Sequence, residues 1–214
     1  MSRLPVCETF ASIQGESTHA GRRCFFIRLA GCNLRCAYCD TAYAWEGGTM
    51  REIDDLVAEA AASGMDCVEI TGGEPLVHPE TPELAAKLLA AGLETLVETN
   101  GSLDIGLLPP GCRRIVDCKL PDSGMAEHNL ESNYAELTPL DEVKFVVSSR
   151  RDFDCALAAI DRFALAERTP HLIFSPVWGK VDFAELARWV LECRRPVRMQ
   201  LQMHKLIWGD KKGV

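Results

Sequence analysis

The sequence predicts an α/β protein built as an incomplete parallel β/α barrel, with about six parallel strands and a reduced set of helices. Short apolar, β-branched segments recur along the chain, and helical patterns follow several of them after a Gly or a Pro. These segments are apolar on both faces, which suits parallel strands buried between two layers. A complete eight-unit barrel typically needs ~250 residues, whereas this chain has 214, so we expect an open or partial barrel.

Seven segments are expected to be strands: 24–29, 67–71, 94–99, 114–118, 143–147, 172–174 and 198–202. Four segments have a helical pattern: 51–63, 81–91, 152–164 and 182–193. The first two end before a Gly, and the last two open with Asp, which favours a helix start. Segments 102–113 and 120–141 show no clear helix. Alternating strands and helices imply right-handed crossovers in one domain spanning residues 1–214.

Composition points to a small-molecule substrate. The net charge is -8, from 31 acidic and 23 basic residues, whereas nucleic-acid binders usually present a basic face. No apolar run approaches the ~20 residues that span a bilayer, and residues 1–9 show no secretory signal. We therefore expect a cytoplasmic protein that binds neither nucleic acid nor membrane, and whose ten cysteines stay reduced.

Three cysteines follow the first strong strand in a Cys-x3-Cys-x2-Cys pattern: Cys32, Cys36 and Cys39. Sites in parallel α/β proteins lie beyond the carboxyl ends of strands, so this is the position of an active-site loop. Three thiolates can hold three corners of a [4Fe-4S] cluster and leave one iron open to an exogenous ligand. The alternatives are a structural zinc site with a distant fourth ligand, or three chance cysteines.

The remaining seven cysteines are best interpreted as small buried hydrophobic residues, because most lie in apolar segments. They are Cys7, Cys24, Cys67, Cys112, Cys118, Cys155 and Cys193.

With Tyr38 before the last cysteine, the triad resembles the signature of the radical S-adenosylmethionine superfamily. Gly72-Gly73-Glu74-Pro75, at the end of the next strand, resembles the second motif of that superfamily. The resemblance implies that S-adenosylmethionine chelates the open iron through its amino and carboxylate groups, and that the Gly-Gly-Glu-Pro edge receives the amine. Glycines allow close backbone approach, and the Glu74 carboxylate would be a charge-assisted partner for the amine.

Over nearly the whole chain the resemblance narrows to the 7-carboxy-7-deazaguanine synthase family. The similar segments are 12–17, 26–29, 39–41, 98–101, 143–147, 202–205 and 208–214. The family implies a radical carbon–nitrogen lyase that contracts the ring of 6-carboxy-5,6,7,8-tetrahydropterin to 7-carboxy-7-deazaguanine and releases ammonia. It also implies a homodimer, a flavodoxin-type reductant and a place in the biosynthesis of queuosine in tRNA or of another deazapurine.

The same resemblance implies roles for individual residues. Thr41 would be the protein ligand of Mg²⁺, although by sequence alone it could equally cap the following turn. The implied pterin-binding residues are Ile13, Gln14, Gly15, Glu16, Arg28, Thr99 and the terminal Val214. The implied S-adenosylmethionine-binding residues are Tyr38, Asp40, Gly73, Glu74, Gly101, Asp117, Cys118, Lys119, Phe174, Ser175, Pro176 and Val177.

Residue chemistry supports some of these roles. Gln14 and Glu16 suit the guanidine-like edge of a pterin, and Arg28 can bind a carboxylate through two hydrogen bonds. Taken singly, these residues could also be a solvated turn and a surface ion pair. The chain departs from its relatives at Asp117-Cys118, where many have Ser-Pro, and at Ser175, where many have Gln. These departures leave the side-chain contacts of Asp117 and Ser175 open.

Two other functions remain possible at this point. An activating enzyme for a glycyl-radical partner uses the same cysteine spacing, but it needs a surface for a large protein, and this chain has little spare length. A non-catalytic zinc module would instead be colourless and hold stoichiometric zinc.

Overall fold

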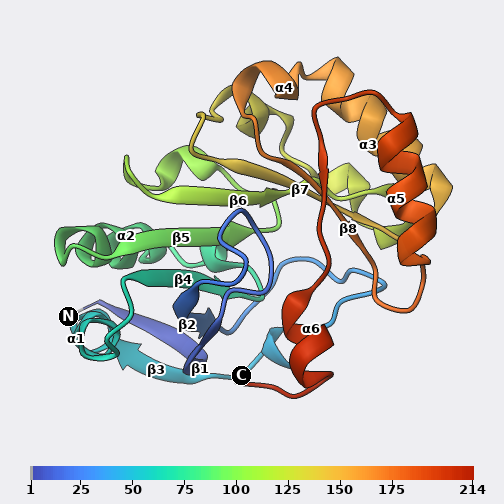
Figure 1. Cartoon of the computed structure of the whole chain (residues 1–214). Helices are drawn as coiled ribbons and strands as arrows, with labels where there is room; N and C mark the ends of the chain where they lie inside the picture. The colour runs from blue at the N-terminus through green and yellow to red at the C-terminus, as the bar shows by residue number, and fades with distance from the viewer. Residues whose placement is uncertain (1) are drawn as a thin grey trace.

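The computed structural model describes residues 2–214, and it contains one nine-stranded sheet in the order β3-β1-β2-β4-β5-β6-β7-β8-β9 (Figure 1). Every neighbouring pair from β2 to β9 is parallel. The six longer parallel strands are β2 (Arg23–Leu29), β4 (Cys67–Gly72), β5 (Glu94–Thr99), β6 (Arg113–Asp117), β7 (Glu142–Val147) and β8 (Leu172–Pro176). The predicted fold class, with six parallel strands, is confirmed.

The barrel is open because β3 and β9 are free edges. β1 (Arg3–Ile13) pairs antiparallel with both β2 and β3 (Thr49–Glu52). Neither β1 nor β3 was predicted: β1 is half-buried and includes Pro5, so it lacks the continuous apolar character of the parallel strands. β9 (Arg198–Met199) has two residues, shorter than the predicted segment 198–202.

The four predicted helices are confirmed as α1 (Ile53–Ala62), α2 (Thr81–Ala90), α3 (Arg150–Arg162) and α5 (Phe183–Glu192). α3 begins two residues before its predicted start because the Ser149 hydroxyl caps it, accepting from the Asp152 amide. The Asp182 carboxylate caps α5 in the same way.

Two short helices, α4 (Leu165–Arg168) and α6 (Met203–Trp208), were not predicted. At six residues or fewer, neither presents a helical repeat that a sequence pattern can detect. Segments 102–113 and 120–141 contain short 3₁₀ turns and no α-helix, as their lack of periodicity predicted, and Arg113 already belongs to β6.

One face of the sheet packs against the helices, and the other face points to the inside of the barrel. In Figure 1, α1 lies near β3 and α2 lies beside β5, whereas α3 and α5 lie on the side of β7 and β8. Strand residues that point outward, such as Ile27, Val68 and Phe145, join the main core with helix residues such as Leu84 and Phe153. Because side chains alternate along a strand, the other half of each strand faces inward. Five of these inward residues form a small inner core: Cys24, Phe26, Cys67, Leu96 and Ile115.

The cysteines outside the triad behave largely as expected. Cys24, Cys67, Cys112 and Cys118 are buried, while Cys7, Cys155 and Cys193 are half-buried. All ten cysteines are free thiols.

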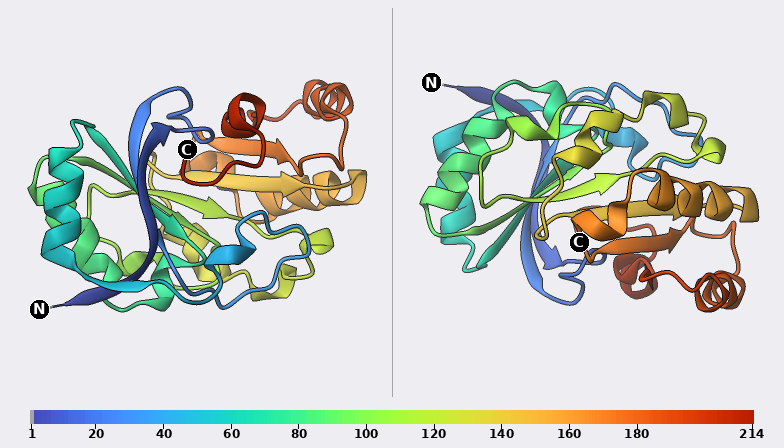
Figure 2. Two further views of the ribbon diagram at one scale, coloured as in Figure 1. Left: turned by 90° about the horizontal axis from the view of Figure 1, so that it is seen from below. Right: turned by 90° about the horizontal axis from the view of Figure 1, so that it is seen from above.

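The C-terminal segment, residues 198–214, returns to the beginning of the chain. Figure 2 shows it, in red, approaching the long blue strand β1. The Lys212 ammonium lies 4.0 Å from the centre of the Tyr43 ring, and the Met203 amide donates to the Gly15 carbonyl at 2.9 Å. Among residues 2–214, no helix has the length and apolar character needed to cross a bilayer.

Candidate active site

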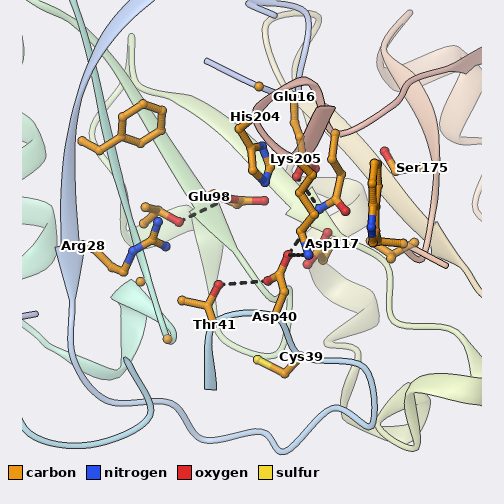
Figure 3. Close-up of a pocket in the computed structure, with 18 of the residues that line it drawn as sticks. Glu16, Arg28, Cys39, Asp40, Thr41, Glu98, Asp117, Ser175, His204 and Lys205 are labelled. Atoms are coloured by element: carbon orange, nitrogen blue, oxygen red, sulfur yellow. Dashed lines mark hydrogen bonds and ion pairs between the residues drawn. The ribbon is translucent and has the colours of Figure 1, made fainter. Parts of the chain in front are cut away.

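The carboxyl ends of the parallel strands surround a cavity of about 680 Å³ (Figure 3). Its walls come from β1, β2, β4 to β8, the cysteine loop and the C-terminal segment. This volume lies within the ~300–1,000 Å³ typical of small-molecule sites. The predicted active-site edge of the sheet is therefore the edge that holds the large cavity.

The cysteine loop forms one wall. Cys32, Cys36 and Cys39 are half-buried and all line the cavity. In the described part of the chain, no three side chains of His, Cys, Asp or Glu lie close enough together to bind one metal ion. The thiolates of an iron–sulfur cluster bind different iron atoms, so they need not converge on one point.

Two glycines let the loop after β4 pack against the cysteine loop. A Cβ on Gly73 would lie 2.2 Å from the Gly31 carbonyl oxygen and 2.8 Å from the Cys32 Cβ, and one on Gly72 would lie 2.1 Å from the Leu29 oxygen. The backbones are joined directly, because the Glu74 amide donates to the Gly31 carbonyl at 2.8 Å. Any side chain at position 73 would displace the loop that carries the first cysteine.

The Glu74 carboxylate is not free to receive an amine, contrary to the expectation from sequence. It is fully buried, does not line the cavity and accepts hydrogen bonds from the Leu76 amide (2.9 Å), the Thr99 hydroxyl (2.8 Å) and the Asn100 amide (2.5 Å). Burial raises the pKa of Glu74 to about 7, although these hydrogen bonds oppose the shift. Glu74 ties the end of β5 to the loop after β4.

The opposite wall holds buried charges. Lys144 on β7 pairs with Glu98 on β5, with Glu16 at 3.1 Å and with Asp117 on β6 at 3.7 Å. Burial alone would lower the pKa of Lys144, but the three carboxylates outweigh it and raise that pKa. Lys119 donates to Asp117 at 2.6 Å. Burial alone would raise the pKa of Asp117, but the two ammonium groups hold it below its usual value.

Two buried polar atoms on this wall have no hydrogen-bond partner within residues 2–214: Asp117 Oδ1 and Ser175 Oγ. Both residues line the cavity. Buried polar atoms are rarely left unpaired, so this wall is suited to a ligand with hydroxyl or amine groups. S-adenosylmethionine carries both, and the residues present therefore fit it.

Among the expected pterin-binding residues, Arg28 has the most unused binding capacity. Its Nε donates to Glu8 Oε1 at 2.8 Å, and its guanidinium lies 5.7 Å from the Phe10 ring centre and 5.9 Å from that of Tyr43. In Figure 3, Arg28 lies across the cavity from Asp117 and Ser175. The terminal nitrogens can still bind an anion.

Gln14 is in the cavity wall, but its side chain is occupied. Its Oε1 accepts from the Glu16 amide at 2.8 Å, and its Nε2 donates to the buried Glu69. Burial and the nearby Glu98 raise the pKa of Glu69 well above its usual value. Gln14 therefore shapes the segment that it belongs to. Glu16 and Glu98 also line the cavity, and each of their carboxylate oxygens has one partner within the chain: Lys144 and Gln202 for Glu16, Lys144 and Thr71 for Glu98.

Thr41 also reaches the cavity, and its hydroxyl donates to Asp40 Oδ1 at 2.9 Å. Asp40 Oδ2 lies 3.3 Å from both Gln202 Nε2 and Lys205 Nζ, so the cysteine loop is linked to the C-terminal segment (Figure 3).

The cavity brings together most of the residues implied by the resemblance. All seven expected pterin-binding residues line it, as do Tyr38, Asp40, Gly73, Asp117, Lys119, Ser175 and Val177. Five expected S-adenosylmethionine-binding residues do not: Glu74, Gly101, Cys118, Phe174 and Pro176. Phe174, for example, points outward and stacks on Phe145 in the main core.

Sequence reasoning assigned no role to several cavity residues: Glu69, Thr71, Glu98, Lys144, Lys205 and Tyr43. The strand residues could have been found, because a charged residue inside an otherwise apolar strand stands out. Glu69, Glu98, Asp117 and Lys144 each occupy such a position, and all four line the cavity.

Comparisons with known proteins agree with this geometry. A family model described as the radical SAM superfamily matches residues 26–190. The Streptococcus suis SuiB structure bound to S-adenosylmethionine shares the fold, with a TM-score of 0.57 and 13% identity over 79% of this chain and 48% of SuiB. The chain belongs to the radical SAM superfamily.

Relatives with higher sequence identity are described as 7-carboxy-7-deazaguanine synthases. A 7-carboxy-7-deazaguanine synthase from Chlorobaculum tepidum is 43% identical over 99% of this chain and 97% of its own length. One from Koribacter versatilis is 40% identical over 99% and 100%, respectively. The crystal structure of QueE from Escherichia coli matches with a TM-score of 0.75 and 25% identity over 94% of this chain and 95% of that one. Within the superfamily, the chain is a member of the 7-carboxy-7-deazaguanine synthase family.

Proposed function

We propose that this chain converts 6-carboxy-5,6,7,8-tetrahydropterin to 7-carboxy-7-deazaguanine with release of ammonia, using S-adenosylmethionine, one [4Fe-4S] cluster and Mg²⁺. The observation that carries the proposal is that a single cavity holds the three-cysteine loop, a partly free arginine and an acidic wall. A carboxylated pterin needs both of the last two features, because it has an anionic group and an edge of N–H donors.

Cys32, Cys36 and Cys39 would hold the cluster, and the glycine edge at Gly73 would border S-adenosylmethionine. Asp117 Oδ1 and Ser175 Oγ, which lack hydrogen-bond partners within residues 2–214, would accept its hydroxyl or amine protons. When bound, the cluster and S-adenosylmethionine supply one-electron chemistry that removes a hydrogen atom from the substrate.

The chain itself would orient the pterin. Arg28 would bind the substrate carboxylate, and Glu16 and Glu98 would accept from the guanidine-like edge. Phe26 and Ile115 line the cavity as an apolar floor for the flat ring. Orienting groups of this kind can contribute ~7–11 kcal/mol to lowering a reaction barrier.

Mg²⁺ would bind beside the cysteine loop through the Thr41 hydroxyl. Mg²⁺ prefers oxygen ligands and often takes few from the protein, with substrate and water completing its octahedron. The adjacent Asp40 carboxylate, which accepts from Thr41, would favour a cation there. In Figure 3, Thr41 lies on the same side of the cavity as Arg28, so the proposed metal would lie on the side of the carboxylate that Arg28 binds.

The C-terminal segment would help to exclude water from the cavity. Gly209 to Val214 contribute to its wall, and Lys205 is held by Asp40. Val214 therefore belongs to the proposed pterin site as part of this cover.

The test is anaerobic purification followed by measurement of iron, sulfide and zinc, then an assay with dithionite, S-adenosylmethionine and 6-carboxytetrahydropterin. We expect a brown protein with about four iron atoms per chain and formation of 7-carboxy-7-deazaguanine and ammonia in equal amounts. A colourless protein with stoichiometric zinc would instead identify a zinc module. Cleavage of S-adenosylmethionine that requires a second protein would identify a glycyl-radical activating enzyme.

The proposal extends to the cellular setting. We propose a cytoplasmic homodimer that is reduced by a flavodoxin-type protein and whose product enters queuosine or another deazapurine. Sedimentation velocity tests the dimer, replacement of dithionite by reduced flavodoxin tests the electron donor, and queuosine content of tRNA in a deletion strain tests the pathway.

A further inference from the structure

The hairpin loop between β1 and β2, residues 14–22, carries the proposed pterin-binding segment Gln14 to Glu16. It crosses the inner face of the barrel and runs alongside β7. Glu16 meets Lys144 at 3.1 Å, and two residues further on, the Thr18 amide and hydroxyl donate to Glu142. The loop is thus attached to β7 both inside the cavity and at the amino end of the strand. The C-terminal segment also holds it, through hydrogen bonds to Gly15, Glu16 and Ser17.

His19 adds to the attachment that Thr18 makes at the amino end of β7. Its side chain is 8% exposed and lies between carboxylates from two strands. Nε2 is 3.0 Å from Glu94 Oε1 at the start of β5, and Nδ1 is 3.8 Å from Glu142 Oε1 at the start of β7. Two carboxylates facing both nitrogens of one ring favour the imidazolium, which can donate from both.

The two carboxylates differ in their other partners. Glu94 also binds Arg22, at the end of the same loop, at 2.6 Å, and Arg113 at 2.8 Å. It is therefore neutralised without His19, and the loop keeps one tie to β5 through Arg22. Glu142 is 1% exposed, and among the described residues the ion pair recorded for it is with His19. A buried carboxylate without a cation is costly, so the charge on His19 matters chiefly to Glu142 and the loop that Glu142 holds.

We infer that His19, as imidazolium, is a positioning residue that fixes the Gln14 to Glu16 segment for pterin binding by tying its hairpin loop to β5 and β7. This inference rests on the proposed function. It concerns the affinity for the pterin and not the cysteine loop, because His19 lies at the opposite ends of the strands from Cys32, Cys36 and Cys39.

Protonation supports this role. The hydrogen bond with Glu142 raises the pKa of His19, burial opposes the shift, and Glu94 and Cys67 add to it. Glu142, Glu94 and Cys67 are the titratable groups that face the ring. Arg22 and Arg113 influence it indirectly, because both pair with Glu94. Since the pKa is raised in the folded protein, the attachment is present at low pH and is lost as pH rises through the folded pKa.

The decisive experiment compares wild type and His19→Gln over pH 6 to about 9, the range around the histidine pKa. At the low end we expect the pterin KM of His19→Gln to be about tenfold higher, as for loss of one charged hydrogen bond, with kcat little changed. The KM of wild type should rise with pH toward the variant's value, while the KM of the variant stays flat. His128→Gln, which changes an exposed histidine in the same way, should match wild type.

A second measurement does not depend on turnover. NMR titration of the His19 ring in the cluster-free protein should give a pKa above the ordinary ~6.5, and Glu142→Gln should lower it. Glu142→Gln also serves if His19→Gln folds poorly, because it should raise the pterin KM in the same direction.

The outcomes separate the two claims. A wild-type chain that does not convert the pterin overturns the proposed function and the role of His19 with it. An active wild type whose pterin KM keeps the same value and pH dependence in His19→Gln overturns the positioning role alone.

Discussion

The residues expected to bind ligands fall into two groups, those already paired within the chain and those with binding capacity left over. Gln14 and Glu74 belong to the first group, since internal donors and acceptors use their polar atoms. Arg28, Asp117 and Ser175 belong to the second. The sequence placed all five residues in the site. It could not show which of them are already paired within the chain, because pairing depends on contacts between distant strands.

Arg28→Ala should raise the pterin KM at least tenfold, because loss of one member of a hydrogen-bonded charge pair costs ~2–5 kcal/mol. Arg28→Lys should recover little, since an ammonium cannot make two parallel hydrogen bonds to a carboxylate. Steady-state kinetics with varied pterin measure both. The control is Arg162→Ala, which removes an exposed arginine paired with Glu131 on the outside of the barrel. An unchanged KM in Arg28→Ala would place the substrate carboxylate elsewhere.

Cys36→Ala should abolish cluster binding and turnover, because two thiolates cannot replace three in holding the cube. Iron and sulfide analysis and the S-adenosylmethionine cleavage assay provide the readouts. Cys155→Ala, which truncates a half-buried cysteine on α3 away from the cavity, should keep both iron and activity. Full activity in Cys36→Ala would contradict the assignment of the cluster ligands.

At the level of elements, the position of the cysteine loop is set by backbone contact with the loop after β4. The long apolar strands were predictable because burial on both faces leaves a continuous pattern in the sequence. β1 was not, because its half-buried residues alternate irregularly and its role depends on pairing with β2. The glycine pair was recognised as a motif, but the close approach that requires it appears only in three dimensions.

Gly73→Ala should therefore reduce cluster content and stability together. The added Cβ would meet the Gly31 carbonyl oxygen at 2.2 Å, and overpacking of this kind typically costs ~1–3 kcal/mol. Iron content and thermal unfolding measure the two effects. Gly106→Ala is the matched control, since its Cβ would meet only the Asp104 side chain, at 3.0 Å. Wild-type iron content in Gly73→Ala would show that the loop can shift without loss.

At the scale of the whole molecule, the C-terminal segment supplies part of the wall of the cavity inside an open barrel. The length of the chain predicted an incomplete barrel, and the order of strands agrees with that. The resemblance assigned Val214 to the pterin site. The sequence pattern could not show that Gln202 and the rest of the tail from Gly209 onward also line the cavity, because α6 is short and the tail has no periodic pattern.

A chain that ends at Trp208 should bind the cluster normally but bind the pterin more weakly. Removing residues 209–214 takes away part of the cavity wall while leaving the cysteine loop and the Lys205–Asp40 pair in place. Iron analysis and pterin KM, measured on the same preparation, test this expectation. Equal loss of iron and substrate affinity would show that the tail supports the cysteine loop instead.

The inner core of Cys24, Phe26, Cys67, Leu96 and Ile115 lies between the cavity and the carboxylates around His19. Thiols and hydrocarbon carry no chain of strong donors and acceptors along which a proton could travel. A proton that reaches His19 would then come from bulk solvent on the side of the partly exposed Glu94 carboxylate. A change in the charge of His19 would then reach the cavity through the hairpin loop 14–22, because that loop carries Glu16.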